Sequence, residues 1–131
     1  MNFAGFDTAF YPGDAVVDWL KANTNLVWCG YYLAPAPSHG DTSWMGKRAR
    51  LVSHGWGIAP IYVGQQIGGP GSHKATSDQG AVDGAQAAAM MKAEGFPIGS
   101  CVILDLEGGT MTPNFAAYAQ AWIQAVLSGL Y

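Results

Sequence analysis

Short apolar runs and amphipathic stretches alternate along this chain, and together they predict four strands that are each followed by a helix. The apolar runs are rich in β-branched and aromatic residues and are bounded by turn residues, which is typical of strands. We expect these strands at residues 2–8, 26–33, 58–66 and 100–107. Apolar residues at helical spacing predict the helices, which we expect at residues 15–22, 44–54, 77–94 and 113–129.

The expected helix ends carry capping residues. Asp14 and Ser43 are predicted to cap the first two helices, and Thr112 followed by Pro113 is typical of the start of the fourth. Each helix should turn one apolar face inward. For the second and fourth helices, the predicted inward residues are Met45, Ala49 and Val52, and Phe115, Ala119, Trp122, Ile123 and Val126.

Four successive strand–helix units without a hairpin signal indicate an α/β fold with a parallel sheet and right-handed crossovers. In such a sheet the carboxyl ends of all strands meet at one edge, where α/β proteins build their sites. The residues expected at or near that edge are Asp7, Tyr31, Tyr32, Gln65, Asp105 and Glu107.

The fourth predicted strand ends in two acidic residues, in the stretch SCVILDLEGG. Because side chains alternate along a strand, Asp105 and Glu107 should point to the same face, together with Cys101 and Ile103. Residues two apart on a strand have Cα atoms roughly 6.5–7 Å apart, so the two carboxylates should perturb each other. This arrangement is typical of general acid and base chemistry.

Composition narrows the classes of function. The 131 residues are 50% hydrophobic and 11% charged, which predicts one folded domain. A net charge of −3 with only six Lys and Arg argues against nucleic acid as a partner. No apolar run is long enough to span a membrane, and the first residues lack the pattern of a signal peptide.

The cysteines, histidines and loops suggest no cofactor and no metal site. Cys29 and Cys101 fall in predicted strands and are expected to be buried free thiols. His39 and His73 lie in polar loops and are expected to be solvated, and neither cysteine has a histidine or another cysteine at ligand spacing. The basic residues near the end of the second helix are interpreted as a solvated face, and Trp19, Trp28, Trp44 and Trp122 as core residues.

Five segments in order along the chain resemble a known family. They are GFDTAFYPG, GYYLAPAP, GIAPIYVGQQ, SDQGAVDGAQAAAMMKAEGFPIGS and VILDLEGG. They resemble the glycoside-hydrolase-like domains of the DUF1906 (Rv2525c-like) kind, which are bacterial TIM (β/α)8 barrels similar to the family 25 lysozymes that cleave peptidoglycan. The resemblance implies that residues 1–131 are the N-terminal half, (βα)4, of such a barrel, truncated after the fourth unit. It also implies a secreted or cell-envelope protein.

The resemblance suggests roles for individual residues. Glu107 matches the proton donor of the lysozymes, Asp105 its charge partner or a base that assists the substrate, and Asp7 an acid that stabilises or positions the sugar. The physics is compatible, because clustered carboxylates resist simultaneous ionisation and one stays protonated near neutral pH. Side chains with flat or amide groups near the strand ends are the expected sugar contacts: Tyr32, Tyr62, Gln65 and Gln66.

Half of a barrel would leave the first and fourth strands as open edges, which predicts self-association. Our first interpretation is a truncated chain or a fragment of a longer product. The second is a dimer that closes two half-barrels, and the third is a half-barrel that is stable as a monomer.

Three functions remain open at this stage. The first is a glycoside hydrolase of the muramidase kind that acts on peptidoglycan or a related cell-wall glycan. The second is a non-catalytic carbohydrate or cell-wall binding module of the same fold. The third, ranked last, uses Asp7, Asp105 and Glu107 as oxygen ligands for Mg²⁺ or Ca²⁺ in a phosphodiesterase-like site.

Overall fold

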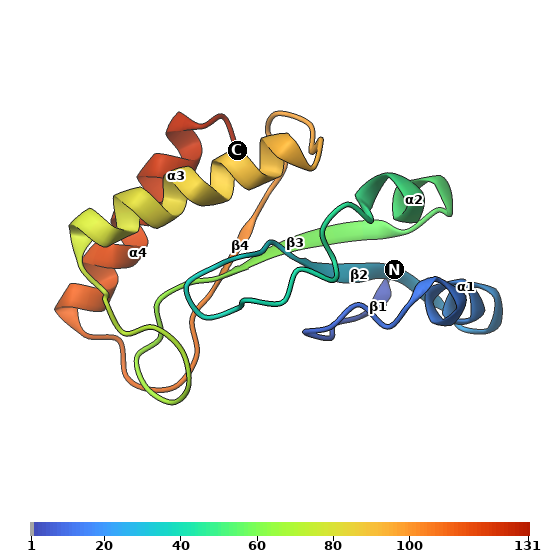
Figure 1. Ribbon diagram of the computed structural model, residues 1–131, viewed down its shortest axis with the longest axis horizontal. Helices are drawn as coiled ribbons and strands as arrows, with labels where there is room; N and C mark the ends of the chain where they lie inside the picture. Colours follow the sequence, from blue (N-terminus) through green and yellow to red (C-terminus); the bar gives the residue numbers. More distant parts are fainter. Residues whose placement is uncertain (1) are drawn as a thin grey trace.

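The computed structural model describes residues 2–131 and consists of four strands that alternate with four helices (Figure 1). The strands are β1 (Ala4–Phe6), β2 (Leu26–Tyr32), β3 (Gly57–Val63) and β4 (Ile103–Asp105). The helices are α1 (Asp14–Asn23), α2 (Arg48–Ser53), α3 (Ser77–Ala93) and α4 (Pro113–Ser128). The predicted α/β class and the order of its elements are confirmed.

The sheet is parallel throughout, and its strand order β1-β2-β3-β4 is the order of the sequence. Trp28 pairs with Gly57 across β2 and β3, and Val63 pairs with Asp105 across β3 and β4. Right-handed crossovers between neighbouring strands in this order place all the helices on one face of the sheet. The other face corresponds to the interior of a barrel, so the fold is a (βα)4 half-barrel with β1 and β4 at its edges.

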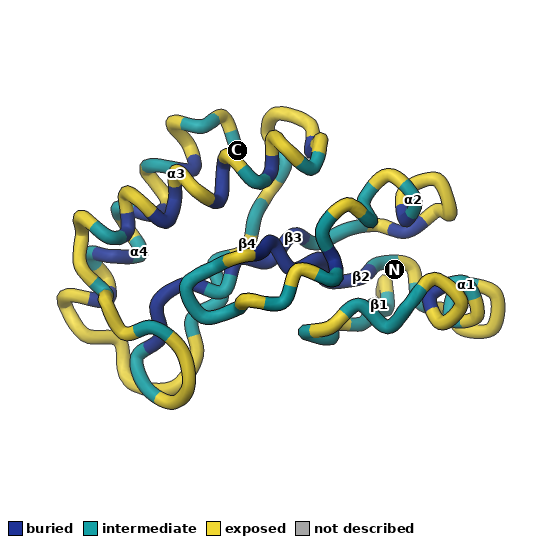
Figure 2. The backbone as a smooth tube through the Cα atoms, in the orientation of Figure 1, coloured by how far each residue is buried: buried dark blue, intermediate teal, exposed yellow. Residues whose placement is uncertain are grey.

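The core lies between the sheet and the helices. Cys29, Tyr31 and Leu33 alternate along β2 and its end, and all three are fully buried. They belong to one apolar cluster with residues from every helix, including Val17 of α1 and Leu51 of α2. Figure 2 shows this buried layer as dark blue stretches along β2 and β3 and on the inner sides of α3 and α4. Alternation along the strands therefore separates a core face from the barrel-interior face.

The second helix is shorter than expected. It begins at Arg48 rather than Trp44, because the preceding residues form turns and Gly46 has a positive φ of 78°. Ser43 therefore does not cap it, and the Ser43 Oγ instead accepts a hydrogen bond from the Tyr11 N–H at 2.9 Å. The two edge strands, β1 and β4, are also shorter than the predicted runs, since each has a neighbour on one side only.

The capping predictions have different outcomes. Thr112 caps α4, and its Oγ1 accepts a hydrogen bond from the Phe115 N–H at 3.2 Å. Asp14 is not the cap of α1, because it lies inside the first turn and Gly13 occupies the cap position. The Asp14 carboxylate instead accepts the Tyr11 hydroxyl hydrogen bond at 2.6 Å and lies 3.3 Å from the Arg50 guanidinium.

Several predicted core positions are exposed. Val52 on α2, Ile123 on α4 and Trp19 on α1 are each about half exposed or more, while Leu51 and Tyr118 are fully buried. One apolar face per helix was predicted to turn inward, and these three residues lie outside the face that each helix packs against the core. Cys101 is also exposed, contrary to prediction, because β4 begins two residues after it at the open edge.

The basic residues at the end of α2 are not a free solvated face. The Arg50 guanidinium donates to the Asp18 carboxylate at 2.6 Å, and His54 Nδ1 lies 2.9 Å from the same carboxylate. These pairs connect α2 to α1 on the surface, where such interactions contribute little to stability.

Two glycines allow α3 and α4 to pack closely. A Cβ built on Gly80 would lie 2.3 Å from the Tyr118 carbonyl oxygen, and one on Gly84 would lie 2.4 Å from the Trp122 carbonyl oxygen. Real Cβ atoms do not approach oxygen so closely. The backbone of α4 therefore lies directly against α3 because these positions carry no side chain.

We predict that Gly84→Ala lowers the free energy of unfolding by about 1–3 kcal/mol, because α4 must move away from α3. This loss would oppose the gain of about 1 kcal/mol in helix propensity that Ala brings. Urea denaturation measures it, and Ala81→Gly on the exposed side of α3 gives the propensity effect alone. A Gly84→Ala protein as stable as the unmodified one would show that the close approach is not needed.

Candidate functional site

The three acidic residues singled out in the sequence line one cavity on the barrel-interior face. Asp7 follows β1, Asp105 ends β4, and Glu107 lies two residues further on. The cavity has a volume of about 310 Å³. Apolar and aromatic side chains of β2, β3 and β4 complete its wall: Trp28, Tyr32, Ala59, Ile61 and Ile103. The predicted alternation along the fourth strand is therefore observed as far as Glu107.

Gly30 makes room for the Asp7 carboxylate. A Cβ on Gly30 would lie 2.8 Å from Asp7 Oδ1 and 3.0 Å from Ile61 Cδ1. The Asp7 side chain therefore crosses directly over β2. Sequence reasoning missed Gly30, although a glycine inside the apolar run LVWCGYYL is a known signal for a close approach.

Trp28 lies against the β1 backbone on the interior face. A Cβ on Gly5 would lie 2.1 Å from the Trp28 ring, and the indole N–H donates to the Phe3 carbonyl at 3.2 Å. Sequence analysis placed Trp28 in the core, but the structure places it in the wall of the carboxylate cavity, only partly buried. It gives this cavity a flat apolar surface beside its acids.

The cavity raises the pKa of two groups. Burial, followed by the negative charges of Glu107 and Asp7, raises the pKa of the Asp105 carboxyl above its ordinary value. Burial, followed by the interaction with Asp7, also raises the pKa of the Tyr32 hydroxyl. Asp105 therefore keeps its proton to a higher pH than a solvated aspartate, and Tyr32 stays a neutral hydrogen-bond donor.

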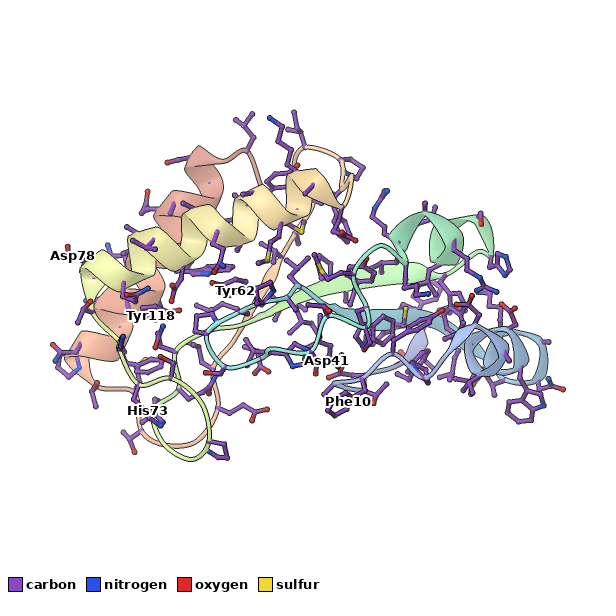
Figure 3. The ribbon with its side chains drawn as sticks, in the orientation of Figure 1. Phe10, Asp41, Tyr62, His73, Asp78 and Tyr118 are labelled. Carbon is purple, nitrogen blue, oxygen red and sulfur yellow. The ribbon has the colours of Figure 1, made fainter. Side chains whose placement is uncertain are left out.

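The structure does not bring Tyr62 to this cavity. Tyr62 is fully buried on the helix-facing side of β3, and its hydroxyl donates to the Gln86 side chain on α3 at 2.6 Å. Figure 3 shows Tyr62 between the sheet and α3. The reason is the alternation along β3, which sends Ile61 to the cavity and its neighbour Tyr62 to the helices.

Gln65 is directed toward the helices as well. It is 2% exposed, and its amide nitrogen donates to the Asp83 carboxylate of α3 at 3.0 Å. The same carboxylate accepts from the Tyr118 hydroxyl at 2.9 Å and from the Gln79 amide at 2.7 Å. Gln65 thus joins the end of β3 to both α3 and α4 instead of lining the cavity.

Gln66 lies behind the carboxylates. It is 5% exposed, and its side-chain amide bonds to the backbone of Asp105 and Glu107. Of the four residues predicted to contact sugar, only Tyr32 lines the cavity. The two glutamines and Tyr62 are held by contacts inside the fold.

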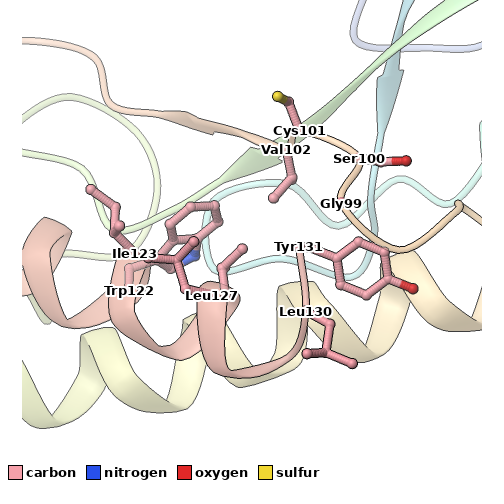
Figure 4. A pocket seen from close by; sticks show the side chains of 10 residues that line it. Gly99, Ser100, Cys101, Val102, Trp122, Ile123, Leu127, Leu130 and Tyr131 are labelled. Carbon is pink, nitrogen blue, oxygen red and sulfur yellow. The ribbon is translucent and has the colours of Figure 1, made fainter.

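A second hollow, of about 530 Å³, lies between the start of β4 and the outer side of α4. Figure 4 shows Val102, Trp122, Ile123 and Leu127 around it. This α4 groove is mostly apolar, and no Asp or Glu side chain lines it. It is the exposed side of the open β4 edge.

Residues 2–131 show neither a metal-binding cluster nor a membrane-spanning helix. No group of three or more His, Cys, Asp and Glu side chains is placed there to hold a metal ion. In the same part of the chain, no helix has both the length and the apolar character needed to cross a membrane.

Comparisons with known proteins give one family and one fold. A family model described as Rv2525c-like, glycoside hydrolase-like domain matches residues 18–131, a range that includes Asp105 and Glu107 but not Asp7. A 1.07 Å crystal structure of an uncharacterized B. stearothermophilus protein is similar over 99% of this chain, with a TM-score of 0.67 and 18% identity. The chain spans 58% of that protein. No curated protein matches the chain.

We predict that Asp105→Asn raises the melting temperature at pH 7. The folded protein raises the pKa of Asp105, so ionising this carboxyl at neutral pH destabilises the folded state, and the amide removes that cost. The gain should disappear as the pH falls below the ordinary aspartate pKa of 3.8, where the carboxyl is protonated in both states. Thermal unfolding at pH 7 and pH 3 measures the difference between the variant and the unmodified protein.

The control is Asp78→Asn, in the exposed first turn of α3. There the negative charge is favourable to the helix dipole, so its removal should lower the melting temperature slightly at pH 7. If Asp105→Asn is also destabilising at pH 7, the Asp105 charge is not unfavourable in the fold.

Proposed function

The chain belongs to the Rv2525c-like, glycoside hydrolase-like domain family, and we propose that it hydrolyses glycosidic bonds in peptidoglycan or a related cell-wall glycan. The observation that supports this most directly is the convergence of Asp7, Asp105 and Glu107 on one cavity with an aromatic wall. Glycoside hydrolysis uses a pair of carboxyl groups on either side of the scissile bond. Aromatic and apolar surfaces are suited to the flat faces of sugar rings.

In this proposal Glu107 donates the proton to the glycosidic oxygen. It lies two residues beyond β4 and is exposed, so its side chain can reach a glycan that is too large to enter the cavity. An acid in this role must lie within hydrogen-bond reach of the leaving oxygen. The exposure of Glu107 beside the cavity supports this role, because a glycan oxygen can approach its carboxyl group.

Asp105 and Asp7 act on the reacting sugar, the one on which positive charge develops. Asp105 is half-buried beside Glu107, where it serves as the charge partner of the acid or as a base that assists the substrate. Asp7 approaches from β1 and stabilises the positive charge that develops on the reacting sugar. Tyr32 lines the same cavity and donates its hydroxyl hydrogen bond to a sugar hydroxyl.

We predict that Glu107→Gln lowers the turnover of peptidoglycan at least 100-fold while leaving the melting temperature within a few degrees, because an exposed amide replaces an exposed acid. Release of reducing ends from cell-wall peptidoglycan measures turnover, and co-sedimentation with the same material measures binding. Asp78→Asn on α3 is the matched surface control and should keep full activity.

If the unmodified protein sediments with peptidoglycan but releases no product, the domain is a binding module and the hydrolase proposal fails. Retained turnover in Glu107→Gln would instead show that another group is the acid. A glycan substrate of this kind would also place the protein in the cell envelope or outside the cell, which is part of the proposal.

We also propose that the open edges of the sheet self-associate. The α4 groove exposes about half or more of Ile123 and Leu127, beside an edge strand that has backbone groups free to pair. Contiguous apolar surface of this kind marks contacts between proteins. Pairing of β4 with β1 of a second copy would continue the parallel order and close two half-barrels.

The corresponding prediction is a dimer mass by light scattering in solution. The double change Ile123→Glu and Leu127→Glu should shift the mass toward that of a monomer, because it places charges in the groove. Val82→Glu, at an equally exposed valine on α3, is the control and should leave the mass unchanged. A monomer mass for the unmodified chain would contradict the proposal.

A further inference from the structure

Glu107 lies beyond the last backbone pairing of its strand. β4 ends at Asp105, and β3 ends at Val63, its partner in the ladder. The last backbone hydrogen bond between the two segments joins the Gly64 N–H to the Asp105 carbonyl at 3.3 Å. From there the β3 backbone leaves the sheet. Something other than a neighbouring strand must therefore hold Glu107 in extended register.

The side-chain amide of Gln66 makes the missing contact, the one to the Glu107 N–H. Gln66 Oε1 accepts a hydrogen bond from the Glu107 N–H at 2.6 Å, and Gln66 Nε2 donates to the Asp105 carbonyl at 3.2 Å. The same nitrogen donates to the Gly64 carbonyl at 3.1 Å. One amide group thus bonds to the backbone on both sides of Leu106.

This pattern is that of a parallel β-ladder. There, one residue bonds to the carbonyl before and the N–H after the residue opposite to it, which gives the evenly spaced, slanted bonds of parallel pairing. The Gly64 N–H makes the first of these bonds, to the Asp105 carbonyl, and Gln66 Nε2 is a second donor to that oxygen. Gln66 Oε1 supplies the other bond, from the Glu107 N–H, in place of the Gly64 carbonyl, which accepts from Gln66 Nε2. The amide therefore bridges Gly64 and Glu107 and extends the β4 ladder as far as Glu107.

Gln66 is itself held in place. Its backbone N–H donates to the Ser72 carbonyl at 2.7 Å, and its carbonyl oxygen lies 2.9 Å from His73 Nδ1. Its side chain is almost completely buried. The loop that contains Ser72 and His73 therefore fixes the backbone from which the amide reaches β4, and the amide has no freedom to turn toward solvent.

We propose that Gln66 is the positioning residue for Glu107, and this inference rests on the proposed function of Glu107 as the acid. Gln66 does not line the cavity, so it acts on the reaction through the Glu107 backbone alone. It keeps Glu107 on the same face as Asp105, which brings both carboxyl groups to the substrate. Without it, the Glu107 N–H would lose its acceptor, and the packing of Leu106 against the core would be left to hold this segment.

The test is Gln66→Met, which keeps the length of the side chain and removes its amide. Amide hydrogen exchange followed by NMR should show the Glu107 N–H exchanging at least tenfold faster in this variant, because its acceptor is gone. Turnover of peptidoglycan should fall about 10- to 100-fold in kcat with a smaller change in KM, because the acid is misplaced while the cavity wall remains.

Gln65→Met is the matched control, because Gln65 is the adjacent buried amide but bonds to Asp83 rather than to β4. It should lower stability and leave Glu107 exchange unchanged in the folded protein. A measurement on the unmodified protein needs no variant: the Glu107 N–H should exchange more slowly than that of Gly108, although both residues are exposed and lie beyond β4.

The outcomes separate this inference from the proposed function. Equal exchange of the Glu107 and Gly108 amides in the unmodified protein, or no acceleration in Gln66→Met, would overturn the positioning role. Accelerated exchange with unchanged kcat would overturn its importance for the reaction. Accelerated exchange in a protein that never releases product would support the ladder extension and reject the hydrolase function instead.

Discussion

The hydrogen bonds accepted by the buried Asp83 carboxylate determine how the segments around the site are arranged. It is 3% exposed and accepts hydrogen bonds from three neutral donors, Gln65, Gln79 and Tyr118. A buried carboxylate is costly unless all its hydrogen bonds are made. The end of β3 and the helices α3 and α4 must therefore take one relative position, the one in which all three donors reach Asp83.

This constraint extends to the opposite face of the sheet through two consecutive residues. Gln65 is held on the helix side by Asp83, and the next residue, Gln66, is free to reach the backbone of β4. Gln65 takes part in the buried network, while the adjacent Gln66, whose backbone bonds to Ser72 and His73, positions Glu107. The carboxyl group at the mouth of the cavity is connected in this way to the most buried polar group of the helical layer.

The barrel-interior face, in contrast, carries charge that is unfavourable to stability. It brings three acidic side chains together, and the raised pKa of Asp105 means that its charge is unfavourable to the fold. Glycines at positions 5 and 30 leave space there for Trp28 and Asp7, where side chains would have packed. Strain and unfavourable charge collected in one cavity, with a fully bonded network behind it, are typical of a functional site.

The local pattern of apolar and polar residues predicted much of the fold and part of the site. The order of strands and helices, the parallel sheet and the common face of Asp105 and Glu107 all follow from periodicity, which depends on neighbours two to four residues away. The segments quoted for the family resemblance were sufficient to identify the family. Alternation also accounts for Tyr62, which faces the helices because Ile61 faces the cavity.

Tertiary structure alone decided the rest. The roles of Gln65 and Gln66 depend on Asp83, 18 residues away, and on Glu107, 41 residues away, and no local pattern contains such contacts. The space that Gly30 leaves for Asp7 and the short α2 were decided in the same way. The sequence by itself determined which residues carry acids and amides and on which strand face they lie. Only the packing of distant segments decided which of them meet at the cavity and which hold it together, because hydrogen bonds and close approaches join residues by distance in space and not by order in the chain.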